Sequence, residues 1–133
     1  MCGIIGYSGP KEPLPILING LSRLEYRGYD SAGIAISDGN KITVEKKEGK
    51  LEVLKNHLKD NNIKGNMGIG HTRWATHGVP NDVNAHPHSD NNEEFAIIHN
   101  GIIENYAEIK KDLLEEGFEF KSDTDTEVVA VEL

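Results

Sequence analysis

The chain has 133 residues, of which 37% are hydrophobic and 27% charged, a composition typical of one globular domain that excludes a fibrous or disordered protein. A net charge of −8 with scattered lysines disfavours nucleic acid as a partner. No apolar run approaches the ~18 residues of a membrane span, and no basic region followed by an apolar one opens the chain. We therefore predict a cytoplasmic protein with no membrane partner.

The first half of the chain alternates strand and helix patterns. The apolar, glycine-rich run 2–8 predicts a buried strand. Leucine and isoleucine recur on one helical face over 14–24, which predicts a helix. The β-rich segments 32–37 and 41–47 flank the turn residues 38–40, so they predict an antiparallel hairpin. A purely parallel sheet is therefore disfavoured.

The second half is less regular. A second amphipathic helix is predicted over 51–58, and a strand with several glycines over 65–71. The segment 72–92 has little periodicity, and ordered loops of this length are usually functional or mobile. A strand over 95–99 follows, and then a helix over 105–117 with asparagine as its N-cap and glycine at its end.

The last segment predicts a helix that is cut short. Thr124 and Glu127 have the spacing of a capping box, but the apolar run that follows stops at Leu133 after about two turns with no C-cap. We therefore interpret the chain as part of a longer domain, aggregation-prone on its own. Asp123 and Asp125 stand at the expected helix start, where capping is the default role, and one of them could instead hold a substrate ammonium.

Cys2 is the first candidate for chemistry, and as the only cysteine it excludes a disulfide framework. Removal of Met1 ahead of this small residue would place a thiol and a free α-amine on one residue. The α-amine titrates near ~7.7–8.0 and the thiol near ~8.5, so the amine could accept the thiol proton at neutral pH. The alternative is a small buried hydrophobe at the start of a strand.

Two pairs of neighbouring residues offer groups that could bind a substrate. Asn100-Gly101 lies between apolar runs and is a strong hairpin signal, but the same pair could donate an amide and a backbone N–H to an oxyanion. Arg73 could form a bidentate pair with a carboxylate, and Trp74 could cover a small ligand. The alternative for the second pair is a surface cation stacked on an exposed ring.

Histidines concentrate in the middle of the chain, which raises the question of a metal. Neither an HExxH motif nor a Cys/His spacing supports one, so neutral donors or packed core side chains are favoured over a metal site. The five residues concerned are His71, His77, His86, His88 and His99.

Six segments together resemble one known family. They are CGIIG at 2–6, RLEYRGYDSAG at 23–33, HTRWATHG at 71–78, NAHPH at 84–88, HNGIIENY at 99–106 and SDTDTEV at 122–128. The first is shared by class II glutamine amidotransferases. The second and third make the whole chain similar to the N-terminal glutaminase domain of the glutamine:fructose-6-phosphate aminotransferases, or glucosamine-6-phosphate synthases. The resemblance implies an α+β N-terminal-nucleophile hydrolase fold, a four-layer αββα sandwich with antiparallel sheets, of which residues 1–133 are the N-terminal part.

The resemblance also implies a mechanism without a cofactor or metal. The Cys2 thiolate would attack the side-chain amide of L-glutamine, its own amine would pass the proton to the leaving ammonia, and a γ-glutamyl thioester would then be hydrolysed. The roles implied for the remaining residues are oxyanion donors at Asn100 and Gly101, an α-carboxylate partner at Arg73, an α-ammonium partner at Asp125, pocket walls at Trp74, Thr76 and His77, and support of the terminus by Arg27.

In that family the ammonia passes to C-terminal sugar isomerase domains, absent from residues 1–133, where fructose 6-phosphate becomes glucosamine 6-phosphate for hexosamine synthesis. The resemblance thus implies a glutamine–fructose-6-phosphate transaminase (isomerizing), a homodimer at full length, and a weakly active or inactive isolated chain. Two alternatives stay open. One is another class II amidotransferase, such as an amidophosphoribosyltransferase, and the other is a non-enzymatic histidine-rich metal-binding module.

Overall fold

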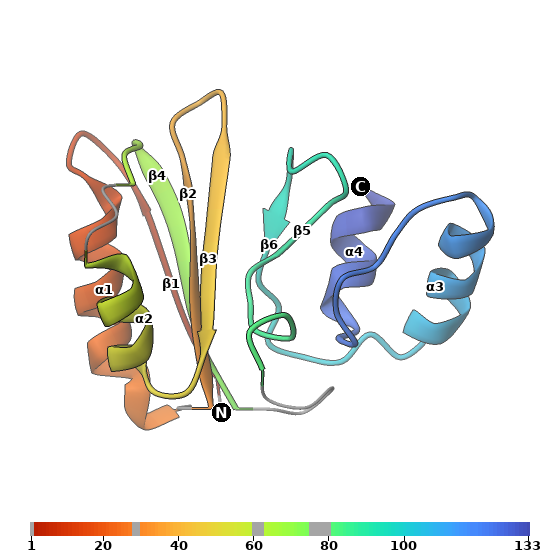
Figure 1. Cartoon of the computed structure of the whole chain (residues 1–133), viewed down its shortest axis with the longest axis horizontal. Helices are drawn as coiled ribbons and strands as arrows, with labels where there is room; N and C mark the ends of the chain where they lie inside the picture. Colours follow the sequence, from red (N-terminus) through yellow and green to blue (C-terminus); the bar gives the residue numbers. More distant parts are fainter. Residues whose placement is uncertain (1, 28–29, 60–62, 75–80) are drawn as a thin grey trace.

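The computed structural model describes residues 2–27, 30–59, 63–74 and 81–133 and arranges them in four layers (Figure 1). Two helices cover the outer face of a four-stranded sheet. A two-stranded sheet faces the inner side of the larger one, and two further helices form the last layer. In the described part of the chain, no helix has the length and apolar character needed to cross a membrane.

The larger sheet is antiparallel throughout, as the sequence predicts. Its strands are β1 (Gly3–Ser8), β2 (Ser31–Ser37), β3 (Ile42–Glu48) and β4 (Met67–Arg73), in the order β1-β4-β2-β3. β2 and β3 form the predicted hairpin. β4 pairs with both β1 and β2, and the register sets Gly3 opposite Thr72. The N-terminus therefore lies beside the carboxyl end of β4.

Both predicted helices of the first half are present on the outer face. They are α1 (Pro13–Leu24), followed by the short 3-10 helix η1 (Glu25–Arg27), and α2 (Leu51–Leu58). Leucines on one face of each helix pack against alternate residues of β2, because successive strand side chains point to opposite faces of the sheet. The core residues that are almost fully buried include Leu17, Leu21, Ile34, Ile36 and Leu54.

The other two layers form a second, smaller core. They contain β5 (His88–Ser89), β6 (Ala96–Ile97), α3 (Tyr106–Glu115) and α4 (Thr126–Glu132). Gly117, the predicted terminating glycine, follows the C-cap of α3 with a φ of +96°, and the last carbonyls of the helix accept the N–H groups of the two residues after the C-cap. Leu113, Val128 and Val131 fill the space between the two helices.

The strand predicted over 95–99 is shorter than expected, and the hairpin interpretation of Asn100-Gly101 is wrong. Only Ala96–Ile97 is extended, and it pairs with β5 rather than with residues 102–103, which form no strand. The Asp90 carboxylate explains the choice, because its Oδ1 accepts the N–H groups of Glu94 and Phe95 at 2.7 and 2.9 Å and so closes the β5–β6 turn. The irregular segment 72–92 thus contains the end of β4 and all of β5.

Two predicted N-caps are also wrong. Asn105 precedes α3 but makes no side-chain capping hydrogen bond. The capping box fails because α4 begins at Thr126 and Glu127 turns back to the loop before the helix, where its carboxylate accepts the N–H groups of Lys121 and Ser122 at 2.9 and 2.8 Å. The Glu127 carboxylate thus binds the loop that precedes α4 and does not complete a capping box.

Candidate active site

Cys2 lies against the end of β4, where the pairing of β1 with β4 places it. The Trp74 N–H donates to Cys2 Sγ at 3.2 Å, and the thiol reaches the Trp74 carbonyl oxygen at 3.5 Å. The cysteine is half-buried and the Trp74 side chain is 49% exposed. A nucleophile in this position is accessible while its sulfur is fixed by backbone groups. The interpretation of Cys2 as a buried hydrophobe is therefore not supported.

Asn100 is brought to Cys2 from 98 positions away. Its Nδ2 donates to the Cys2 carbonyl oxygen at 3.3 Å, and its Oδ1 lies 2.8 Å from His71 Nε2. Gly101 follows directly, and a Cβ at this position would come within 2.8 Å of the His99 ring. The Asn-Gly pair thus sits against the nucleophile instead of closing a hairpin.

Arg73 and Asp125 provide two buried charges of opposite sign near Cys2. Arg73 is 3% and Asp125 is 4% exposed. Burial lowers the pKa of the Arg73 guanidinium, and the charges of Asp30, Cys2 and Asp125 act in the opposite direction. Arg73 therefore lies within electrostatic range of all three of these residues.

Asp125 does not act as a side-chain cap of α4, although it is the residue before the helix. It makes no side-chain capping hydrogen bond, and its Oδ2 accepts the N–H of Ile103 at 2.6 Å. This contact ties the start of α4 to the segment that carries Asn100 and Gly101. The carboxylate is therefore oriented by the site rather than by the helix.

Three predicted site residues cannot be placed. Thr76 and His77 lie outside the described residues, and so does the side chain of Arg27, whose backbone ends η1. Their roles stay predictions.

Three of the histidines that the sequence predicts as neutral donors or packed core side chains are buried next to Asn100, and they form a stack that the sequence does not predict. The ring centroids of His71 and His86 are 4.4 Å apart, and those of His86 and His88 are 4.6 Å apart. Burial lowers the pKa of His71 to about 4 and that of His88 to about 2, and it holds the pKa of His86 far below its ordinary value. The three rings are therefore neutral at pH 7. His88 Nε2 lies 2.7 Å from the hydroxyl of Thr124.

The sequence contained a signal for the position of His71. His71 and Arg73 are two positions apart on a strand, so they share the face of β4 that meets the smaller sheet. Among the described residues, no group of three or more His, Cys, Asp or Glu side chains is arranged to hold a metal ion.

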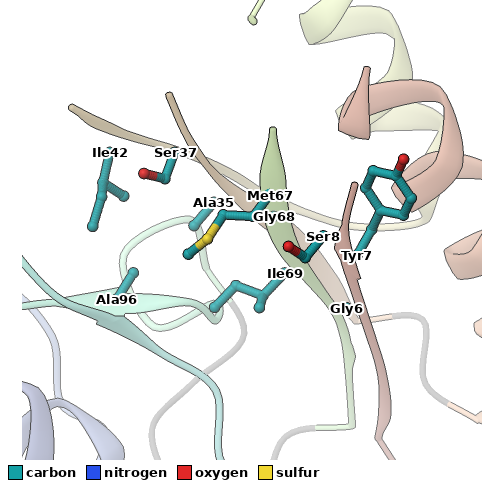
Figure 2. Close-up of a pocket in the computed structure, with 10 residues that line it drawn as sticks. All are labelled: Gly6, Tyr7, Ser8, Ala35, Ser37, Ile42, Met67, Gly68, Ile69 and Ala96. Atoms are coloured by element: carbon teal, nitrogen blue, oxygen red, sulfur yellow. The ribbon is translucent and has the colours of Figure 1, made fainter. Parts of the chain in front are cut away.

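An apolar pocket of about 410 Å³ lies at the opposite end of the larger sheet from Cys2. Figure 2 shows Met67 and Ile69 of β4 together with Ala96 of β6 on its walls. Ser8 and Ser37, which flank Met67 in the sheet, line the same pocket. None of the candidate site residues that the structure describes lines it.

Solved structures and a domain family match this arrangement. Glutamine phosphoribosylpyrophosphate amidotransferase from B. subtilis superimposes with a TM-score of 0.80 and 34% identity, covering 98% of this chain and 28% of that one. A structure described as the allosteric regulatory enzyme of purine biosynthesis gives a TM-score of 0.82 at 32% identity, with the same coverage. A sequence model of the glutamine amidotransferase domain matches residues 50–133. The chain belongs to this family, and its fold is the α+β fold of N-terminal-nucleophile amidotransferases.

Within that family, enzymes of one name are similar to almost the whole chain. The glutamine–fructose-6-phosphate aminotransferase (isomerizing) of Fusobacterium nucleatum is 64% identical over 131 residues, covering 98% of this chain and 22% of that protein. The enzyme of the same name from Clostridium perfringens is 60% identical over 129 residues, covering 97% and 21%. The chain thus spans about a fifth of the length of these relatives.

Proposed function

We propose that this chain is the glutamine-hydrolysing part of a glutamine–fructose-6-phosphate aminotransferase. The observation that carries the proposal is the meeting of Cys2 with Asn100, across 98 positions of sequence, beside the buried charges of Arg73 and Asp125. A nucleophile, a donor for an oxyanion and a pair of opposite charges are the groups that amide hydrolysis of a zwitterionic amino acid requires.

The reaction would begin with a Cys2 freed from Met1. The α-amine takes the thiol proton, and the sulfur attacks the side-chain carbonyl carbon of glutamine. The carbonyl oxygen becomes an oxyanion that accepts hydrogen bonds from Asn100 Nδ2 and the Gly101 N–H. The intermediate collapses to a γ-glutamyl thioester as the amine returns the proton to the departing ammonia. Water then cleaves the thioester to release glutamate and restore the thiol.

Glutamine would be recognised through its two charges. Arg73 would pair with the α-carboxylate in the fork geometry that guanidinium groups favour, and Asp125 would hold the α-ammonium. The burial of both side chains supports these roles, because a desolvated charge binds an opposite charge more strongly than an exposed one. Trp74, Thr76 and His77 would line the pocket, and Arg27 would support the terminus.

The acceptor of the ammonia would be fructose 6-phosphate. Relatives named for that acceptor are 55–64% identical to this chain, whereas the phosphoribosyl enzyme named above is 34% identical. That difference favours the sugar-phosphate acceptor over the amidophosphoribosyltransferase alternative. The same proposal includes three further statements. Other parts of the protein would form glucosamine 6-phosphate, the full-length protein would be a homodimer, and it would be cytoplasmic.

The test is glutamate release from glutamine by the natural full-length protein and its Cys2→Ala variant. We expect the variant to lose glutamine hydrolysis but to keep synthesis of glucosamine 6-phosphate from free ammonia and fructose 6-phosphate. Intact mass should show that active material begins at Cys2. Full turnover of glutamine by Cys2→Ala, or by protein that retains Met1, would refute the mechanism.

A further inference from the structure

The His71 ring contacts the Asn100 amide on the side away from Cys2. His71 is 1% exposed on β4 of the larger sheet, and its Nε2 lies 2.8 Å from Asn100 Oδ1. On its other side the same amide donates from Nδ2 to the Cys2 carbonyl oxygen at 3.3 Å. The Asn100 amide is thus held by hydrogen bonds to the His71 ring on one side and to the Cys2 backbone on the other.

The hydrogen-bonding pattern assigns the proton on the histidine ring. An amide oxygen only accepts, so His71 Nε2 must carry the hydrogen and donate it to Asn100. In a neutral ring Nδ1 is then bare, and among the described residues this buried atom has no hydrogen-bond partner. Burial lowers the pKa of His71 to about 4, which keeps the ring neutral at physiological pH.

The opposite orientation of the amide is disfavoured on both sides. If the Asn100 amide were flipped, its oxygen would face the Cys2 carbonyl oxygen, and His71 could accept from its NH₂ only with the ring hydrogen on Nδ1, where no described residue accepts it. The stacking of His86 on the His71 ring, with centroids 4.4 Å apart, also opposes rotation of the donor away from Asn100. One tautomer of one ring therefore determines which end of the amide points toward Cys2.

We propose that His71 is a positioning residue that fixes the Asn100 amide with its NH₂ toward Cys2, so that the oxyanion donor is oriented before glutamine binds. The inference rests on the proposed function, in which Asn100 stabilises the oxyanion. A preorganised donor is effective because no reorganisation accompanies charge development. His71 acts only through Asn100 and touches neither the substrate nor the sulfur.

The alternative is that His71 only fills space in the core. A pair of isosteric substitutions separates the two roles. Glutamine at position 71 can place an amide N–H where Nε2 lies, whereas methionine has similar length and flexibility but no donor. Both variants, made in the natural full-length protein, should be compared with the wild type for kcat and KM of glutamine hydrolysis. His57, whose ring on the outer helix α2 lies 2.9 Å from Glu45, provides the control substitution His57→Met.

We expect His71→Met to lower kcat by about tenfold to a hundredfold with little change in KM, since a misoriented donor loses part of what removal of one oxyanion donor costs. His71→Gln should recover most of this loss, and His57→Met should behave as the wild type. In an Asn100→Ala background, His71→Met should have no further effect, because the group through which His71 acts is gone.

The alkylation rate of Cys2 distinguishes loss of the oxyanion donor from a general disruption of the site. Alkylation of Cys2 by iodoacetamide develops no carbonyl oxyanion, so its rate should change less than about twofold in His71→Met. Equal kcat for the methionine variant and the wild type would overturn the proposal. So would an equal loss in both the wild-type and the Asn100→Ala backgrounds, or equal losses of kcat and alkylation rate. If wild-type protein hydrolyses no glutamine, the proposed function has failed instead.

Discussion

Acidification should destabilise the fold through its buried histidines well before the carboxylates titrate. His71, His86 and His88 are at most 6% exposed, and burial lowers the pKa of each. In the unfolded chain each would titrate near ~6.5. A histidine with a lowered folded pKa takes up its proton on unfolding, so its stability is fully present above pH ~6.5 and lost as pH falls toward the folded pKa.

The size of the effect follows from the same values. With a folded pKa of about 4, His71 loses about 2 kcal/mol of the free energy of unfolding between pH 7 and pH 5. His86 and His88, with still lower pKa values, lose about the same each, so the three together lose roughly 6 kcal/mol. That loss is comparable to the entire stability of many domains. Asp82 and Asp90 have lowered pKa values too, but they lose their contributions only below the ordinary Asp range, under pH ~4.

Urea unfolding of the chain at pH 7 and at pH 5, followed by circular dichroism, measures this difference. The variant His86→Gln should remove about a third of the pH dependence. A loss of less than about 1 kcal/mol in the wild type, or an identical slope for His86→Gln, would refute the neutral buried stack.

Three substitutions test the packing at Gly33 and the proposed roles of Arg73 and Asn100. Gly33→Ala should cost at least about 3 kcal/mol or prevent folding, because its Cβ would lie 1.9 Å from the His86 carbonyl oxygen; Gly6→Ala, with 3.9 Å of clearance, is the control for thermal melting. Arg73→Ala should lower kcat/KM for glutamine about thirtyfold or more but spare ammonia-dependent synthesis, and equal losses would contradict its role. Asn100→Asp should slow glutamine hydrolysis at least about a hundredfold at nearly unchanged Tm; unaltered turnover would contradict the oxyanion role.

The larger sheet and its helices could be predicted because their cores are periodic. Leu17 and Leu21 recur at helical spacing, and Ile34 and Ile36 alternate along a strand, so the side chains that the pattern selects are the ones that are buried. The turn residues 38–40 then place the hairpin. In this half of the molecule, local sequence and tertiary packing favour the same structure.

The structure of the smaller layers could not be predicted in this way, because polar residues there make contacts other than the local ones that their sequence patterns predict. Asn100-Gly101 has the sequence of a hairpin turn, yet its amide bonds to Cys2 and His71. Glu127 has the position of a capping residue, yet its carboxylate serves the loop before the helix. A local sequence pattern predicts the hydrogen bonds that a residue can make with its neighbours in sequence. In these two cases the side chain makes other hydrogen bonds in the folded structure.

The site itself depends on how closely the two sheets approach. Cys2 precedes β1 of the larger sheet, and His71 and Arg73 lie on β4 of that sheet. Asn100 follows β6 of the smaller sheet, so the alignment of these residues depends on the packing of the two layers. Gly33 pairs with His71 in the sheet, and its missing side chain is what lets the backbone of His86 come near. The His86 ring then stacks on His71, which in turn contacts Asn100. The absence of one side chain on a central strand therefore helps to determine where the amide beside the nucleophile points.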